Sequence, residues 1–169
     1  MKSVGILIVV AAVAAPAGFA KPPSPVTGYL VNVTPQIGVY HSIGARLDKI
    51  LSELPMTNVD PKVEKLNKVC DSFEALALGW NKIEAPKGLK ARHRGMGRVF
   101  EIQAQGWRIY AAALFTRHTD EIQAALSHLR EMLRSAAYLQ HRWSAALQGA
   151  LIRAGIRVPG WLHSMATSP

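Results

Sequence analysis

Cysteine is almost absent from this chain of 169 residues, since Cys70 is its only one. A single thiol excludes an intramolecular disulfide and the Cys-x-x-Cys-His motif of covalent haem attachment. Aromatic residues make up only 7% of the chain, whereas 49% of its residues are hydrophobic and alanine is frequent. This composition excludes a largely disordered chain. It favours helices that pack through small side chains over a sheet of β-branched residues.

Long hydrophobic runs are missing beyond residue 20. The one apolar stretch, Val4–Ala15, has twelve residues, follows Lys2 and is broken by Pro16. A helix that spans a bilayer needs about 20 apolar residues, so the pattern predicts a secretory signal peptide, with cleavage after Ala17 or Ala20. The expected location is periplasmic, cell-envelope or extracellular, with no transmembrane span after cleavage. An uncleaved N-terminal anchor is the alternative.

Four later segments repeat apolar residues at steps of three and four, the period of an amphipathic helix. Thr34-Pro35 and Asp60-Pro61 each have the order of an N-cap and a first helical residue, which predicts that two helices begin there. The other two helices are expected at residues 89–115 and 119–155. The predicted division is a signal peptide at 1–20, an extended proline-rich leader at 21–33, four helices within 34–155 and a short C-terminal tail at 156–169.

Short connections between these segments favour antiparallel neighbours, so the predicted fold is an all-α, up-down four-helix bundle. The expected helices are unequal, because at about 1.5 Å per residue the first spans roughly 30 Å and the last roughly 50 Å. The apolar surface of the longer hairpin therefore needs a cover. The sequence leaves three candidates open, namely the leader, the tail, or a second subunit in a homo-oligomer.

Residues with catalytic or metal-binding chemistry do not fall into a recognisable pattern. No two of the six histidines are three or four residues apart, so paired metal ligands on one helix are not indicated. His93 lies on an apolar stripe and is expected to be buried and hydrogen-bonded. Cys70 also lies on such a stripe, where a thiol behaves as a small hydrophobe. No catalytic residue, metal ligand or cofactor is predicted, and Gly95-Met96-Gly97 is expected to allow close packing and not to form a phosphate loop.

Positive charge is the one feature with a functional implication. The chain has 20 Lys and Arg against 11 Asp and Glu. Residues 21–84 carry seven of each sign and sum to zero, whereas residues 85–169 carry twelve basic and four acidic side chains. In an up-down bundle the start of the third helix and the end of the fourth share one pole. The candidate anion-binding residues at that pole are Lys87, Lys90, Arg92, Arg94, Arg98, Arg153 and Arg157.

A basic pole suggests an anionic partner, and an envelope polymer or a lipid surface fits the expected location. Nucleic acid is disfavoured by that location, and aromatic side chains do not alternate with the arginines as in a base-stacking platform. The sequence therefore predicts an exported bundle with a non-catalytic binding or structural role at the cell envelope or outside the cell. A haem-type cofactor bundle, and an enzyme whose site is assembled from distant residues, are the alternatives.

Overall fold

The computed structural model describes residues 24–53 and 59–167, and every regular element in these ranges is a helix. This confirms the all-α prediction. The predicted signal peptide and its cleavage points lie outside the described residues. The elements in chain order are α1 (Pro25–Ser52), α2 (Asp60–Asn81), the 3-10 turn η1 (Lys87–Leu89), α3 (Lys90–Thr116), α4 (Thr119–Arg153) and α5 (Gly160–Thr167).

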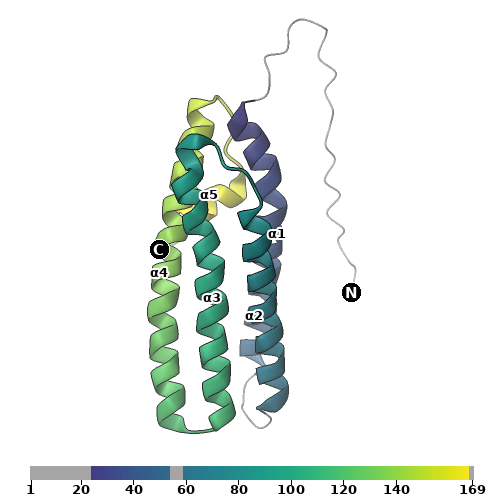
Figure 1. Cartoon of the computed structure of the whole chain (residues 1–169), viewed down its shortest axis with the longest axis vertical. Coiled ribbons are helices and arrows are strands. Elements are labelled where there is room, and N and C mark those ends of the chain that lie inside the picture. The colour runs from purple at the N-terminus through teal and green to yellow at the C-terminus, as the bar shows by residue number, and fades with distance from the viewer. Residues whose placement is uncertain (1–23, 54–58, 168–169) are drawn as a thin grey trace, which may run out of the picture.

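The four long helices run up and down along one axis, as predicted (Figure 1). In the view of Figure 1, α1 and α3 descend, α2 and α4 ascend, and α5 folds back against the upper part of α4. The helix α3 packs against both α2 and α4. Among the helices of the described residues, none combines the length and the hydropathy that a bilayer-crossing segment requires.

The first helix begins at Pro25, ten residues before the predicted first helical residue Pro35, so the expectation of an extended leader is wrong for residues 25–33. Ser24 is the N-cap, and its side chain accepts a hydrogen bond from the Thr27 amide. Pro35 lies inside the helix on its exposed side, where the carbonyl left without an intrahelical partner can be hydrated. The Thr34 hydroxyl donates to the Leu30 carbonyl at 2.7 Å and does not cap a helix end.

This early start and the folded tail cover the long α3–α4 hairpin. With 28 residues, α1 is about 42 Å long, and Tyr29 and Val33 from its first turns are buried in the core. The tail forms α5, which buries Leu162 and Met165. Two of the three covers that the sequence left open, the leader and the tail, are therefore present within the chain itself.

Glycines in α3 let the neighbouring helices approach closely. A Cβ atom on Gly97 would lie 2.7 Å from Asn81 Oδ1 and 3.3 Å from Trp80 Cδ1, and a Cβ on Gly106 would lie 2.9 Å from Leu129 Cδ1. Glycine in a helix interior costs about 1 kcal/mol relative to alanine, and close packing against α2 and α4 is what these positions gain. The interpretation of Gly95-Met96-Gly97 as a packing motif is confirmed at Gly97.

The single cysteine belongs to the core, as predicted. Cys70 is fully buried, and this burial raises the pKa of its thiol to about 11. We therefore expect slow labelling of the native protein by thiol reagents, because the reactive thiolate is scarce. Cys70→Ser should lower the free energy of unfolding by about 1–3 kcal/mol in denaturant titration, since it buries a hydroxyl without an assured partner. Cys70→Ala is the matched control and should lose less. Rapid labelling under native conditions would contradict burial.

Candidate functional site

The upper end of the bundle brings together the seven cations that the sequence singled out, because α3 starts there and α4 ends there (Figure 1). We call them the basic pole. Six of the seven side chains are exposed and Arg92 is half-buried. The members of the basic pole are Lys87 on η1, Lys90, Arg92, Arg94 and Arg98 on α3, Arg153 at the end of α4, and Arg157 in the segment that follows.

Carboxylates are scarce near the basic pole. Glu84 is the only acidic residue between positions 82 and 98, and residues 24–47 and 132–167 contain none. Arg98 is paired with Glu101 at 2.7 Å, one turn further along α3. Within the described residues, the other six cations have no carboxylate within ion-pair distance. Their positive charge is therefore uncompensated, whereas that of Arg98 is compensated.

The lower end of the bundle differs, because several of its cations are paired with carboxylates. The ion pairs there are Lys65–Glu53 at 2.8 Å, Lys68–Glu64 at 2.6 Å and Arg117–Asp60 at 3.5 Å. Exposed pairs of this kind contribute only about 0–1 kcal/mol each to stability. They nevertheless cancel charge locally, so the net positive charge of the molecule is concentrated at the upper end.

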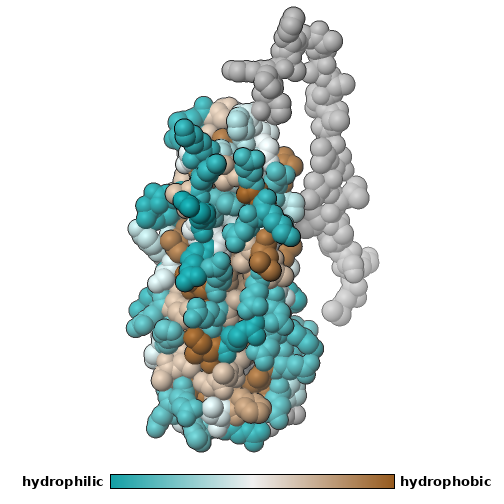
Figure 2. Space-filling view, viewed as in Figure 1, coloured by the Kyte–Doolittle hydropathy of each residue, from teal (hydrophilic) through white to brown (hydrophobic). Residues whose placement is uncertain are grey.

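Two hollows open between the cations of the basic pole. A hollow of about 660 Å³ lies between the first turns of α1 and the α2–α3 connection, and Glu84, Lys87 and Lys90 line it. A second hollow, of about 320 Å³, is lined by Lys90, His93 and Arg94. Figure 2 shows hydrophilic residues over much of the upper end of the visible face. The pole is thus an indented, hydrated surface.

A buried hydrogen-bond network forms the floor beneath these hollows. Trp143 Nε1 donates to the Tyr29 hydroxyl at 2.9 Å, and that hydroxyl lies 2.9 Å from His93 Nδ1. His93 Nε2 lies 3.1 Å from the Trp80 carbonyl, while Trp80 Nε1 donates to the His93 carbonyl at 2.9 Å. A carbonyl only accepts, so His93 Nε2 carries the proton and Nδ1 accepts from Tyr29.

Burial lowers the pKa of His93, although the hydrogen bond to the Trp80 carbonyl opposes this shift. Burial also raises the pKa of Tyr29. The Trp80 ring is stacked on the imidazole, with centroids 4.9 Å apart and planes 14° apart. The prediction of a buried, hydrogen-bonded His93 is confirmed. This network holds α1, α2, α3 and α4 together at the upper end, and it engages both imidazole nitrogens of His93 in hydrogen bonds.

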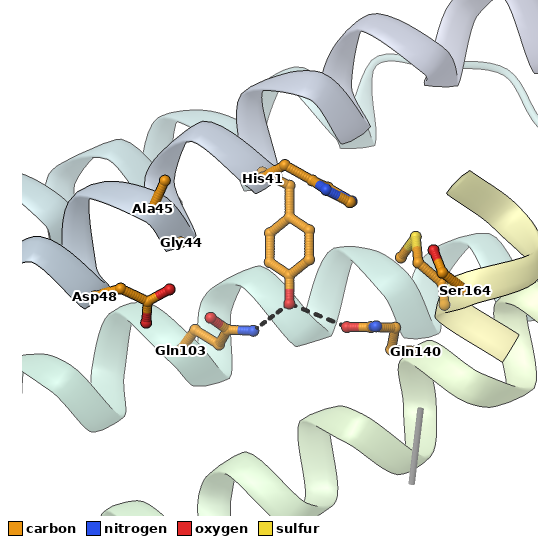
Figure 3. A pocket seen from close by; sticks show the side chains of 9 residues that line it. His41, Gly44, Ala45, Asp48, Gln103, Gln140 and Ser164 are labelled. Carbon is orange, nitrogen blue, oxygen red and sulfur yellow. Dashed lines mark hydrogen bonds between the residues drawn. The ribbon is translucent and has the colours of Figure 1, made fainter. Parts of the chain in front are cut away.

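A second polar cluster, which sequence analysis did not identify as a site, lies around the Tyr40 hydroxyl (Figure 3). Gln103 Nε2 donates to the Tyr40 hydroxyl oxygen at 2.8 Å, and the same hydroxyl donates to Gln140 Oε1 at 3.0 Å. Burial raises the pKa of Tyr40, against the effect of the Gln103 hydrogen bond. The signal in the sequence was the placement of two glutamines on apolar stripes, where leucine would continue the pattern.

This cluster forms one wall of a hollow of about 410 Å³ between α1, α3, α4 and α5, with His41, Asp48 and Ser164 around it. Across residues 24–53 and 59–167, no three side chains of His, Cys, Asp or Glu come close enough to hold a metal ion. The exposed His118 instead lies 3.2 Å from Glu121.

No protein-family model, no curated protein and no solved structure matches the chain.

Proposed function

We propose that the protein is an exported helical bundle whose basic pole binds anionic lipid surfaces, without catalysing a reaction. One observation supports this above all. Six of the seven cations at the pole have no carboxylate partner in the described residues, although Lys65, Lys68 and Arg117 at the lower end are paired. Charge that served only solubility would not need to collect at one end of the molecule.

The pole has the character of a broad electrostatic surface and not of a clamp. Its exposed cations come from η1, α3 and the end of α4, which spreads them over the whole upper end. Each Lys or Arg close to an anionic membrane contributes on the order of 1 kcal/mol. Ile152, beside Arg153, is 62% exposed and offers an apolar contact next to a cation. That combination favours a lipid surface over a soluble polyanion, and it implies that the bundle stands end-on.

The test is a triple variant, Lys87→Gln, Lys90→Gln and Arg94→Gln, in cosedimentation with vesicles. The parent protein should bind vesicles that contain phosphatidylglycerol at low salt and ignore phosphatidylcholine vesicles. Binding should weaken steeply with salt, because the screening length falls to about 8 Å at physiological ionic strength. Removing three cations should weaken binding on the order of 100-fold, the equivalent of about 3 kcal/mol.

The matched control removes the same charge from the lower end, through Lys65→Gln, Lys68→Gln and Arg117→Gln. These cations are paired with carboxylates, so the control variant should bind nearly as well as the parent. Equal losses in both variants would show that net charge alone matters and that the pole does not. A parent protein that ignores anionic vesicles at low salt, or that binds only a soluble polyanion such as polyphosphate, would overturn the lipid proposal.

A further inference from the structure

The hollow beside Tyr40, which we call the amide hollow, is a candidate site independent of the basic pole. Its volume is about 410 Å³, which lies within the range of about 300–1,000 Å³ that is usual for small-molecule sites. Four helices contribute to its wall, so the site depends on the tertiary fold. The lining residues are Tyr40, His41, Gly44, Ala45 and Asp48 of α1, Gln103 of α3, Gln140 of α4, and Ser164 and Met165 of α5.

Hydrogen-bonding capacity is left over in this hollow. Gln103 uses its amide nitrogen on Tyr40, and Gln140 uses its amide oxygen on the same hydroxyl. Within the described residues, the Gln103 carbonyl oxygen and the Gln140 amide nitrogen make no further hydrogen bond, and neither atom is sealed from solvent. Figure 3 shows the two amides on either side of the Tyr40 hydroxyl. The hollow therefore presents one free acceptor, the Gln103 carbonyl oxygen, and one free donor, the Gln140 amide nitrogen, on either side of the Tyr40 hydroxyl.

The charge of the amide hollow differs from that of the rest of the molecule. The chain has 20 Lys and Arg, but none of those in the described residues lines this hollow. Asp48 is exposed there, and it has no ion pair within the described residues. An anionic ligand would meet a carboxylate and no compensating cation. A ligand suited to this wall must donate to the Gln103 carbonyl and to Asp48, and accept from the Gln140 amide.

Hydroxyl groups both donate and accept, so they fit such a mixed wall without carrying charge. We propose that the amide hollow binds a small neutral polyhydroxylated molecule of the size of one sugar unit. Gln103, Gln140 and Asp48 provide the hydrogen bonds, and Tyr40 orients the two amides.

The experiment is a protein-observed NMR titration of the folded protein with glucose and with N-acetylglucosamine. We expect saturable shifts of the Gln103 and Gln140 side-chain amide signals, with a dissociation constant near 1 mM, equivalent to about −4 kcal/mol. Gln140→Leu should weaken binding at least about tenfold, the factor that corresponds to 1.4 kcal/mol. Gln105→Leu is the matched control, because Gln105 is exposed on the same helix as Gln103 and should leave binding unchanged.

Asp48→Asn separates a sugar site from a cation site. Asparagine keeps one acceptor oxygen but carries no charge, so sugar binding should weaken by less than in Gln140→Leu and should remain saturable, whereas binding of a cation should be lost. Ethanolamine and inorganic phosphate serve as charged comparators. Absence of saturable shifts with both sugars would overturn the proposal. So would binding of ethanolamine alone that is abolished by Asp48→Asn, or an equal loss of sugar binding in Gln140→Leu and Gln105→Leu.

Discussion

Trp143→Ala should lower the free energy of unfolding by about 3–5 kcal/mol, the usual range when a buried large aromatic is truncated to alanine. Trp143 is fully buried, its ring meets Trp80 edge-on at 5.3 Å, and its indole N–H donates to Tyr29. The substitution therefore opens a cavity and removes the donor to a buried hydroxyl at once. Denaturant titration followed by far-UV circular dichroism measures the loss.

Two further variants divide this effect into its parts. Trp143→Phe retains an aromatic ring but loses the N–H, so it should be destabilised less than Trp143→Ala. Trp161→Ala truncates an indole that is only half-buried and should be the mildest of the three. A loss below about 1 kcal/mol for Trp143→Ala, a value typical of surface positions and average substitutions, would contradict the packing described for the upper end of the bundle.

His93→Leu should lower the free energy of unfolding by about 1–3 kcal/mol at neutral pH. The imidazole accepts from Tyr29 and donates to the Trp80 carbonyl, so its removal leaves the buried Tyr29 O–H without an acceptor, while the Trp80 carbonyl keeps the Ile83 amide as a donor. Each unsatisfied buried group costs about 1–3 kcal/mol. Leucine is similar in volume, so the loss reports on hydrogen bonding more than on a cavity. A fully stable His93→Leu variant would contradict the network.

The pH dependence of stability provides a second test of the role of His93. The pKa of His93 is lowered in the folded protein, so below the ordinary histidine pKa of about 6.5 the unfolded chain binds a proton that the folded protein does not. The contribution of neutral His93 is thus complete above about pH 6.5 and declines as the pH falls towards the folded-state pKa. The slope for one group cannot exceed about 1.4 kcal/mol per pH unit. In the His93→Leu variant, the melting temperature should depend less steeply on pH between about pH 6.5 and 5. This interval lies above the ordinary pKa values of the carboxylates.

The helical pattern could be predicted where local rules and tertiary packing agree. The stripe of α3, with His93 and Met96 on its buried side, predicted both the helix and its core face. Ser24-Pro25 and Thr34-Pro35 have the same order of an N-cap and a first helical residue, so local rules alone do not choose between them as the start of α1. The core contacts of Tyr29 favour the earlier start, and its hydrogen-bond partner His93 lies 64 residues away. A pattern of neighbouring residues in the sequence cannot reveal a contact between residues so far apart.

The two candidate sites also differ in whether the sequence could predict them. The basic pole follows from counting charges and from the antiparallel order of the helices, so it was visible in the sequence. The pairing of Arg98 with Glu101, three residues later, was also accessible and removes one cation from the unpaired set. The amide hollow was not accessible. Tyr40 and Gln140 are 100 residues apart, and only the fold shows that two stripe glutamines meet at one hydroxyl.

The docking of α5 should be visible in the circular dichroism of the tryptophans. Trp161 of α5 is stacked on Trp143, with ring centroids 6.3 Å apart and planes 16° apart, and Trp143 in turn contacts Trp80. Indole transitions at such separations couple to one another, so the three rings should produce a strong near-ultraviolet dichroism band. Release of α5 would remove the outermost ring and change that band, while the helical far-ultraviolet signal would scarcely change. The native tryptophans thus form a built-in reporter of whether the C-terminal helix is docked.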